Sequence, residues 1–256
     1  MAHRGDAKRA AREERESRER EAAAGEARRR RLGLLAAAVA VAVVIVAVAV
    51  ILSSGGGQKK PAGGGGSSAA DALFAGIPQR GTELGSAAAP VTIYEYADLQ
   101  CPFCADFANT TLPGIVTRYV RPGRVRLVFR NLTFLGPDSV RAAQAAGAAG
   151  LQNRLWNFVD VFYSEQLQEN TGYVTDAFLR GIGGQVSGLN VAKMMGARAD
   201  PTVRAQIVAA RAEAKAAGVN STPSFTIARG SAKPVALNAQ SAGEFASAID
   251  AALAGR

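Results

Sequence analysis

Cys101 and Cys104 are the only two cysteines in this chain of 256 residues, and only Pro102 and Phe103 separate them. A run of β-branched and aromatic residues at 91–96 precedes the pair, and apolar residues at helical spacing follow it through position 119. The pair is therefore predicted to begin a helix. Free N–H groups at a helix N-terminus favour an anion, so we expect the Cys101 thiol to ionise more readily than a free cysteine. Because a thiolate is the species that attacks disulfides, this pattern indicates a pair that opens and closes a disulfide.

Three other interpretations of the pair remain open. A purely structural disulfide between Cys101 and Cys104 would close a very short loop, so it would stabilise the fold little. A closed zinc site takes four Cys or His ligands, and the only histidine, His3, is far away in the sequence. Two thiolates can bind Cu(I), although no histidine or methionine stands beside this pair to complete a site. The redox interpretation is the one that the spacing favours.

An uninterrupted apolar segment at 32–52 predicts a membrane anchor. It contains only Ala, Val, Leu and Ile besides Gly33, and as a helix it would span roughly 30 Å, the thickness of a bilayer core. A cleaved signal peptide is the alternative, but its apolar region would be shorter and its leader less extended. Four arginines at 28–31 precede the segment, whereas only Lys59 and Lys60 follow it closely, which predicts a cytoplasmic N-terminus.

The domain organisation follows from this topology. We expect a charged cytoplasmic leader at 1–31, the anchor at 32–52, a flexible Gly/Ser-rich linker at 53–76 and a folded domain at 77–256. The folded domain would then lie outside the cytoplasm, where disulfides persist. The net charge of +9 is spread along the chain without a basic stripe that carries aromatic residues, so we expect no nucleic-acid binding.

The pattern of the folded domain alternates strands and helices. Strands are predicted at 91–96, 124–132, 224–228 and 234–237, with a possible short strand at 82–84. Pro113 should break the helix of the cysteines near Thr111, and a long helical block should begin at Asp138. Later helices should start at Asp200-Pro201 and at the capping box Ser241-Ala242-Gly243-Glu244. Trp156 and the aromatic residues at helical spacing around it are expected in the core.

Two segments resemble a known family. The run Glu95-Tyr96-Ala97-Asp98-Leu99-Gln100-Cys101-Pro102-Phe103-Cys104, together with Ser221-Thr222-Pro223-Ser224-Phe225, is similar to the membrane-anchored, DsbA-like thiol:disulfide oxidoreductases of bacteria. The resemblance covers essentially residues 77–256. It implies an α/β thioredoxin fold with an inserted helical subdomain at about 138–199. It also implies an enzyme that introduces disulfides into secreted proteins without a bound cofactor.

The resemblance assigns roles to the cysteine pair and its surroundings. Cys101 would be the exposed sulfur that attacks and is attacked, and Cys104 its more buried partner. Thr222 and Pro223 match the family's cis-proline loop, which would lie against the cysteines and pair with an extended substrate. Glu95 matches a buried acidic residue that relays a proton to Cys104, although it could equally be a satisfied strand carboxylate.

Phe103 departs from the family pattern, because many strongly oxidising members carry a histidine there. Without that cation, the Cys101 thiolate would depend on the helix and the backbone alone, which predicts a weaker oxidant. Phe103 could instead offer an apolar contact to unfolded substrates.

The resemblance also implies partners. Cysteine-containing secreted proteins would be the substrates, and a membrane quinone-linked protein would reoxidise the pair. The direction of electron flow depends on fine electrostatics, so a disulfide reductase or isomerase of the same fold is an alternative. A non-catalytic thioredoxin-like module that binds Cu(I) or a partner protein is a second alternative.

The predicted topology can be tested by labelling. In a Cys101→Ser/Cys104→Ser background, Ser67→Cys should react with a membrane-impermeant thiol reagent in intact cells whose outer envelope layers are permeable, because the arginines at 28–31 hold the N-terminus inside. Labelling that requires lysis of the inner membrane would reverse the topology.

Overall fold

The computed structural model describes residues 69–255. The predicted leader and anchor, and the linker as far as residue 68, lie outside this range. None of the described helices is long and apolar enough to cross a membrane.

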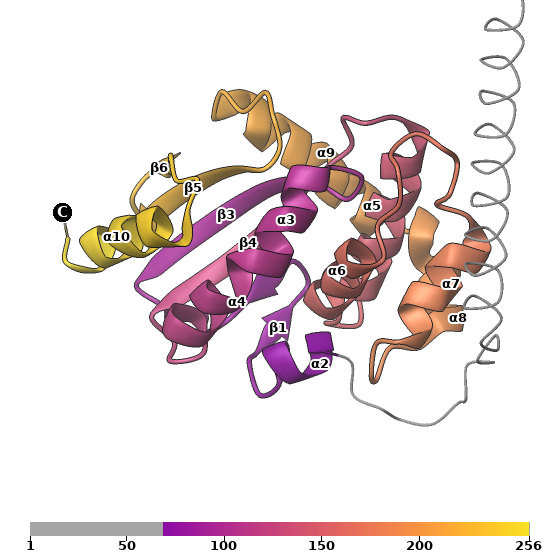
Figure 1. The fold of residues 1–256 in the computed structure, drawn as a ribbon, viewed down its shortest axis with the longest axis horizontal. Coiled ribbons are helices and arrows are strands. Elements are labelled where there is room, and N and C mark those ends of the chain that lie inside the picture. The colour runs from indigo at the N-terminus through magenta and orange to yellow at the C-terminus, as the bar shows by residue number, and fades with distance from the viewer. Residues whose placement is uncertain (1–68, 256) are drawn as a thin grey trace, which may run out of the picture. The chain divides into compact units, whose positions relative to one another are not determined.

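A mixed sheet of six strands forms the centre of the fold, in the order β1-β2-β4-β3-β5-β6 (Figure 1). Strands β3 and β4 run parallel, and every other neighbouring pair is antiparallel. The strands are β1 (Gln79–Arg80), β2 (Glu83–Leu84), β3 (Val91–Asp98), β4 (Val125–Leu132), β5 (Ser224–Arg229) and β6 (Val235–Ala236). All the strands predicted in the sequence are confirmed, whereas β1 was not expected.

Strand β3 is central, and helices cover both of its faces. Ile93 and Glu95 point to the face covered by the cysteine helix α3 (Pro102–Thr110) and the C-terminal helix α10 (Ala242–Leu253). On that face Phe225 of β5 packs against both Phe107 and Phe245, with ring centroids 4.6 and 4.9 Å away. Tyr96 points to the other face and packs against α9 (Pro201–Ala216). Burial on both faces explains why nearly every side chain of β3 is buried, including the polar Thr92, Glu95 and Asp98.

The helix of the cysteines breaks where the sequence predicts. Helix α3 ends at Thr110, and the chain continues from Thr111 into the short helix α4 (Leu112–Ile115) and a π-helical turn (Val116–Val120). Pro113 has no N–H to donate, so an unbroken α-helical ladder through this point is excluded.

A helical insertion separates β4 from α9, as the sequence predicts. Its elements are α5 (Pro137–Gly150), α6 (Leu155–Ser164), α7 (Asp176–Gly184), α8 (Val191–Gly196) and a 3₁₀ turn (Ala197–Ala199). The expected long block from Asp138 is two helices, because the chain turns at 151–154 and Asn153 takes a left-handed φ of 57°. Leu155, Phe158 and Phe162 of α6 are all buried, and Trp156 is in the core.

Local hydrogen bonds set the ends of the later helices. The Asp200 carboxylate accepts from Thr202 N at 2.7 Å at the start of α9, and Gly218 ends that region with a φ of 71°. Ser241 and Glu244 form the predicted capping box at the start of α10.

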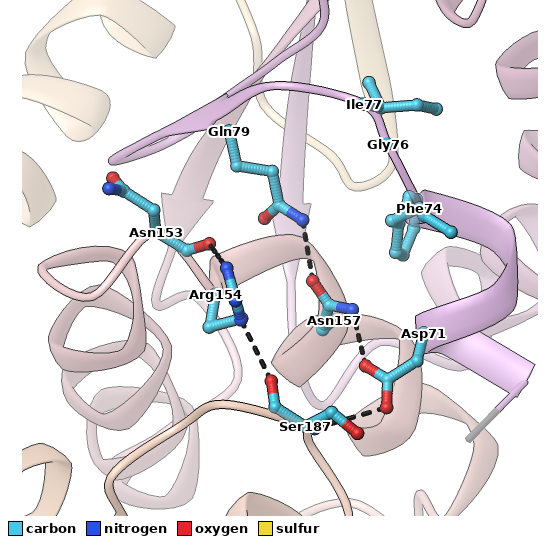
Figure 2. A pocket seen from close by; sticks show the side chains of 10 residues that line it. Asp71, Phe74, Gly76, Ile77, Gln79, Asn153, Arg154, Asn157 and Ser187 are labelled. Atoms are coloured by element: carbon cyan, nitrogen blue, oxygen red, sulfur yellow. Dashed lines mark hydrogen bonds between the residues drawn. The ribbon is translucent and has the colours of Figure 1, made fainter. Parts of the chain in front are cut away.

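The folded region begins earlier than residue 77. The sequence predicts a flexible linker through 76, but α2 (Ala69–Phe74) forms within that range, and its Phe74 packs edge-on against Trp156 with centroids 6.3 Å apart. Polar groups reinforce the attachment, as Figure 2 shows: Asn157 of α6 donates to Asp71 and accepts from Gln79. The short apolar pattern of α2 was hidden by the Gly/Ser-rich composition next to it.

Gly147 lies at a close approach between the insertion and α9. A Cβ added to Gly147 in α5 would lie 2.7 Å from Cγ1 of the buried Val203. We therefore expect Gly147→Ala to lower the free energy of unfolding by about 1–2 kcal/mol in urea denaturation, since overpacking outweighs the helix propensity of alanine. Gly181→Ala in α7 is the control, because nothing lies within 4 Å of its added Cβ. It should stabilise by up to about 1 kcal/mol. Equal effects of the two substitutions would contradict the close packing.

Candidate active site

The cysteine pair begins helix α3, as predicted. Cys101 is the N-cap residue, with φ −74° and ψ 120°, and Pro102 occupies the first turn. The Cys101 carbonyl accepts from the N–H of Cys104 at 3.1 Å and of Ala105 at 3.2 Å. The N–H groups of Phe103 and Cys104 in this first turn also act on the Cys101 sulfur, which makes the position favourable for a negative charge.

The Thr222–Pro223 loop covers the sulfur of Cys101. The peptide bond between Thr222 and Pro223 is cis, and the Cys101 thiol donates to the Thr222 carbonyl oxygen at 3.3 Å. Cys101 is only 4% exposed, so the expectation of an exposed sulfur is wrong. The loop, which is distant in sequence, lies against the sulfur and leaves only a small part of Cys101 exposed.

The two thiols have opposite pKa shifts. The Cys104 thiol, hydrogen bonded to the Cys101 sulfur, lowers the pKa of Cys101 to about 6. Burial opposes this shift, whereas the Thr222 side chain and the N–H groups of Cys104 and Phe103 add to it. Burial raises the pKa of Cys104 well above its ordinary value, and the hydrogen bond with Cys101 raises it further. Both thiols are free in this structure, so it represents the dithiol state.

Glu95 lies beneath the pair on the face of β3 that α3 covers. It is 3% exposed, and burial raises the pKa of its carboxyl group to about 8. Its charge acts on Cys104 and raises the pKa of that thiol. At neutral pH Glu95 is therefore mostly protonated, a state in which it has a proton to give.

Two features near the pair face solvent. Phe103, between the cysteines, is 73% exposed, which is unusual for a large apolar side chain. Beside the cis-proline loop, Pro223, Phe225 and Leu237 help to line a cavity of about 590 Å³. The cavity lies between this loop and the segment that follows β6.

The structure thus brings together Cys101, Cys104, Glu95 and the Thr222–Pro223 loop, and it leaves Phe103 at the surface. Sequence reasoning missed the groups that hold the turn before Cys101. Tyr163 donates to the Asp98 carbonyl at 3.2 Å, and Gln166 donates to the Cys101 carbonyl at 3.2 Å. Both belong to the helical insertion, and no local motif marks them. Asp98 carried a signal, because an aspartate two residues before a turn residue is typical of an Asx turn.

Comparison with known proteins identifies the family. A family model described as Thioredoxin matches residues 79–251. The chain belongs to the thioredoxin family. The match extends from β1 into α10, so this thioredoxin domain includes the helical insertion, and the predicted α/β thioredoxin fold is confirmed.

Curated relatives of this thioredoxin domain carry the name disulfide bond formation protein D. The probable protein of that name from Bacillus cereus is 35% identical over 101 residues, which are 39% of this chain and 47% of that protein. The one from Bacillus subtilis is 31% identical over 98 residues, which are 38% and 44% of the two chains. The chain thus spans about half the length of the curated relatives it matches.

Solved structures show the same fold. Oxidised BdbD from Bacillus subtilis superposes with a TM-score of 0.61 at 22% identity, covering 70% of this chain and 98% of that one. A thioredoxin-like oxidoreductase from Silicibacter pomeroyi gives 0.55 at 28% identity, covering 71% and 96%. Alpha-DsbA1 of Wolbachia pipientis gives 0.58 at 21% identity, covering 73% and 97%. The resemblance to DsbA-like proteins that the two sequence segments indicate is confirmed.

The pKa of Cys101 predicts its reactivity. Alkylation of the reduced protein by iodoacetamide should increase with pH around a midpoint of about 6 at Cys101, while Cys104 stays almost unreactive. Cys104→Ala should move that midpoint up toward 9, because it removes the largest cause of the shift. Mass spectrometry of each cysteine peptide measures both rates. Parallel pH profiles for the two cysteines would contradict the coupling.

The raised pKa of Glu95 predicts that the free energy of unfolding depends on pH. Because its pKa is about 8 in the folded protein and 4.5 ordinarily, the folded state holds the proton more tightly. Stability should therefore fall as the pH rises from 4.5 to 8, and Glu95→Gln should remove this loss. We expect the variant to exceed wild type in unfolding free energy by at least about 2 kcal/mol at pH 8, and by much less at pH 5. The exposed Glu169→Gln is the control, and a difference that is the same at both pH values would contradict the prediction.

Proposed function

We propose that this chain is an extracytoplasmic thiol:disulfide oxidoreductase that introduces disulfides into cysteine-containing secreted proteins through Cys101 and Cys104. The observation that carries the proposal is the pKa of about 6 at Cys101 beside a Cys104 that keeps its proton. A stabilised Cys101 thiolate favours the reduced pair, and a pair that favours its reduced form is an oxidant toward other thiols. This supports oxidation over the reductase and isomerase alternatives.

The exchange proceeds in two steps. A substrate thiolate attacks Sγ of Cys101 in the oxidised pair, the Cys101–Cys104 bond breaks, and Cys104 leaves as a thiolate that takes up a proton. The second substrate thiolate then attacks the substrate sulfur of the mixed disulfide and expels the Cys101 thiolate. The substrate gains a disulfide, and the pair gains two electrons. The low pKa of Cys101 makes it a good leaving group in the second step.

Glu95 is proposed to supply the proton to Cys104 in the first step. The pKa of Cys104 lies well above the ordinary value, so its thiolate is a poor leaving group unless a proton arrives. A carboxyl group with a pKa of about 8 still holds its proton at pH 7, and its field reaches Cys104. Glu95→Gln should then slow the attack of a small thiol on the oxidised protein at pH 7.

Substrates are proposed to bind at the Thr222–Pro223 loop. This loop already contacts the Cys101 sulfur, and the cavity of about 590 Å³ beside it is lined largely by polar residues, among them Asn220, Ser221 and Asn238. The exposed side chain of Phe103, between the two cysteines, offers an apolar contact. A polar cavity suits the backbone of an extended substrate, and Phe103 suits an apolar side chain of an unfolded one.

The location and the partner are proposed on the same grounds. Relatives named disulfide bond formation protein D and the apolar segment at 32–52 support a single-pass protein of the cell membrane with its thioredoxin domain outside the cytoplasm. The reduced pair must return two electrons to an acceptor before the next cycle. We propose a membrane quinone-linked protein for this step.

The proposed direction and intermediate can be tested together. Oxidised protein should transfer its disulfide to a reduced, unfolded substrate, and Cys101→Ser should abolish the transfer. Cys104→Ser should accumulate mixed disulfides with secreted proteins through Cys101, because Cys104 can no longer attack Sγ of Cys101 and release the substrate as a thiol. Non-reducing electrophoresis detects these adducts. An absence of adducts, or a wild-type protein found fully reduced in growing cells, would contradict an oxidase.

A further inference from the structure

We propose that Asp98 is a positioning residue for both thiols: its carboxylate fixes the turn between β3 and α3 to the start of the helical insertion, and its peptide group holds the two cysteines. The proposal rests on the exchange chemistry proposed for Cys101. It assigns a task to a buried acidic residue that the steps described above do not use.

The Asp98 carboxylate is fully buried and accepts four hydrogen bonds. Oδ2 accepts from the N–H groups of Phe134 and Leu135 at 2.7 and 3.0 Å, in the loop after β4. Oδ1 accepts from Gln100 N at 2.9 Å and from the Ser139 hydroxyl at 2.7 Å. One side chain thus joins the turn before Cys101 to the loop before α5 and to the first turn of α5.

The peptide groups of the same residue contact the reactive pair. The Asp98 carbonyl oxygen accepts from Cys101 N at 3.0 Å, and it also accepts from the Tyr163 hydroxyl at 3.2 Å. The Asp98 N–H donates to the Cys104 sulfur and lowers the pKa of that thiol against the larger effect of burial. A shift of the Asp98 backbone would therefore alter the hydrogen bonds of both cysteines at once.

Neighbouring contacts make the turn a rigid unit. Gln166 donates to the carbonyl oxygens of Leu99 and Cys101 at 2.8 and 3.2 Å. The Gln100 side chain donates to the Leu135 carbonyl and the Ser139 hydroxyl, at 2.7 and 3.0 Å. The Asp98 carboxylate and the side-chain amides of Gln100 and Gln166 thus connect the turn to the helical insertion. The insertion therefore helps to fix the positions of the two thiols.

The donors to Asp98 explain why a carboxylate is needed. All four are neutral N–H or O–H groups, and a carboxylate presents only acceptors to them. Asparagine would keep one oxygen and turn its NH₂ group toward N–H donors that then lack a partner. The other ionisable groups that face the pair are Glu95 from β3 and Tyr163 from α6. Neither supplies a cation, so fixed dipoles must stabilise the thiolate.

The test compares three variants by the pH profile of Cys101 alkylation and by the thiol–disulfide equilibrium with glutathione. Asp98→Asn should raise the pKa of Cys101 toward 9 and should weaken the oxidising equilibrium about tenfold, equivalent to about 30 mV. Ser139→Ala removes one of the four donors to Asp98 together with an acceptor of the Gln100 amide, and it should shift both quantities in the same direction by less. Asp138→Asn is the matched control, because Asp138 is buried in the same region but does not bond to the turn, and it should leave both quantities unchanged.

Melting temperature separates positioning from a merely structural role. If Asp98→Asn and Ser139→Ala lower the melting temperature but keep the wild-type pKa and equilibrium, the proposal is overturned. If Asp98→Asn does not fold, Ser139→Ala decides alone, and an unchanged or lowered pKa in that variant also overturns it. An ordinary pKa at Cys101 in the wild-type protein would instead contradict the proposed function, so the two failures are distinguishable.

Discussion

The hydrogen bond between the thiols of Cys101 and Cys104 has opposite consequences for its two partners. It lowers the pKa of Cys101, whose thiolate accepts it, and raises that of Cys104, which must keep its proton to donate. The bond forms only if both sulfurs stay close and dry at the start of α3. The end of β3, the cis-proline loop and the helical insertion each contribute a contact that meets this condition.

Burial determines where negative charge can reside in the site. Burial favours the protonated forms of Glu95 and Tyr163 and raises the pKa of each. Of the two thiols, only Cys101 has enough hydrogen-bond donors to overcome the same penalty. Its thiolate therefore lies next to a second thiol, a carboxyl group and a phenol that keep their protons. Phe103 provides no cation, yet the thiolate is stabilised, because N–H and S–H dipoles act at short range in a dry environment.

Most of the elements of the fold are predictable because their signals are local. Proline at position 113 excludes a continuous helix, the Ser241–Glu244 capping box starts α10, and β-branched residues mark β3. The errors arose where tertiary contacts outweigh local composition. Helix α2 has only six residues and depends on Phe74 packing against Trp156, and β1 has two residues that exist as a strand only through β2. The turn at Asn153 lies within a stretch whose apolar spacing continues across it.

The sequence by itself determined the reactive pair and its place at the start of a helix, because both are carried by residue types at short spacing. The cis-proline loop and the acidic residue on the preceding strand were expected from the resemblance of two sequence segments to a known family. Only the tertiary structure decided that Cys101 is covered and that Asp98, Tyr163 and Gln166 hold the turn before it. Those contacts join residues dozens of positions apart, and a hydrogen bond between distant residues leaves no period or motif in the chain. The pKa values were also decided by the tertiary structure, because ionisation depends on burial and on partners that folding brings together.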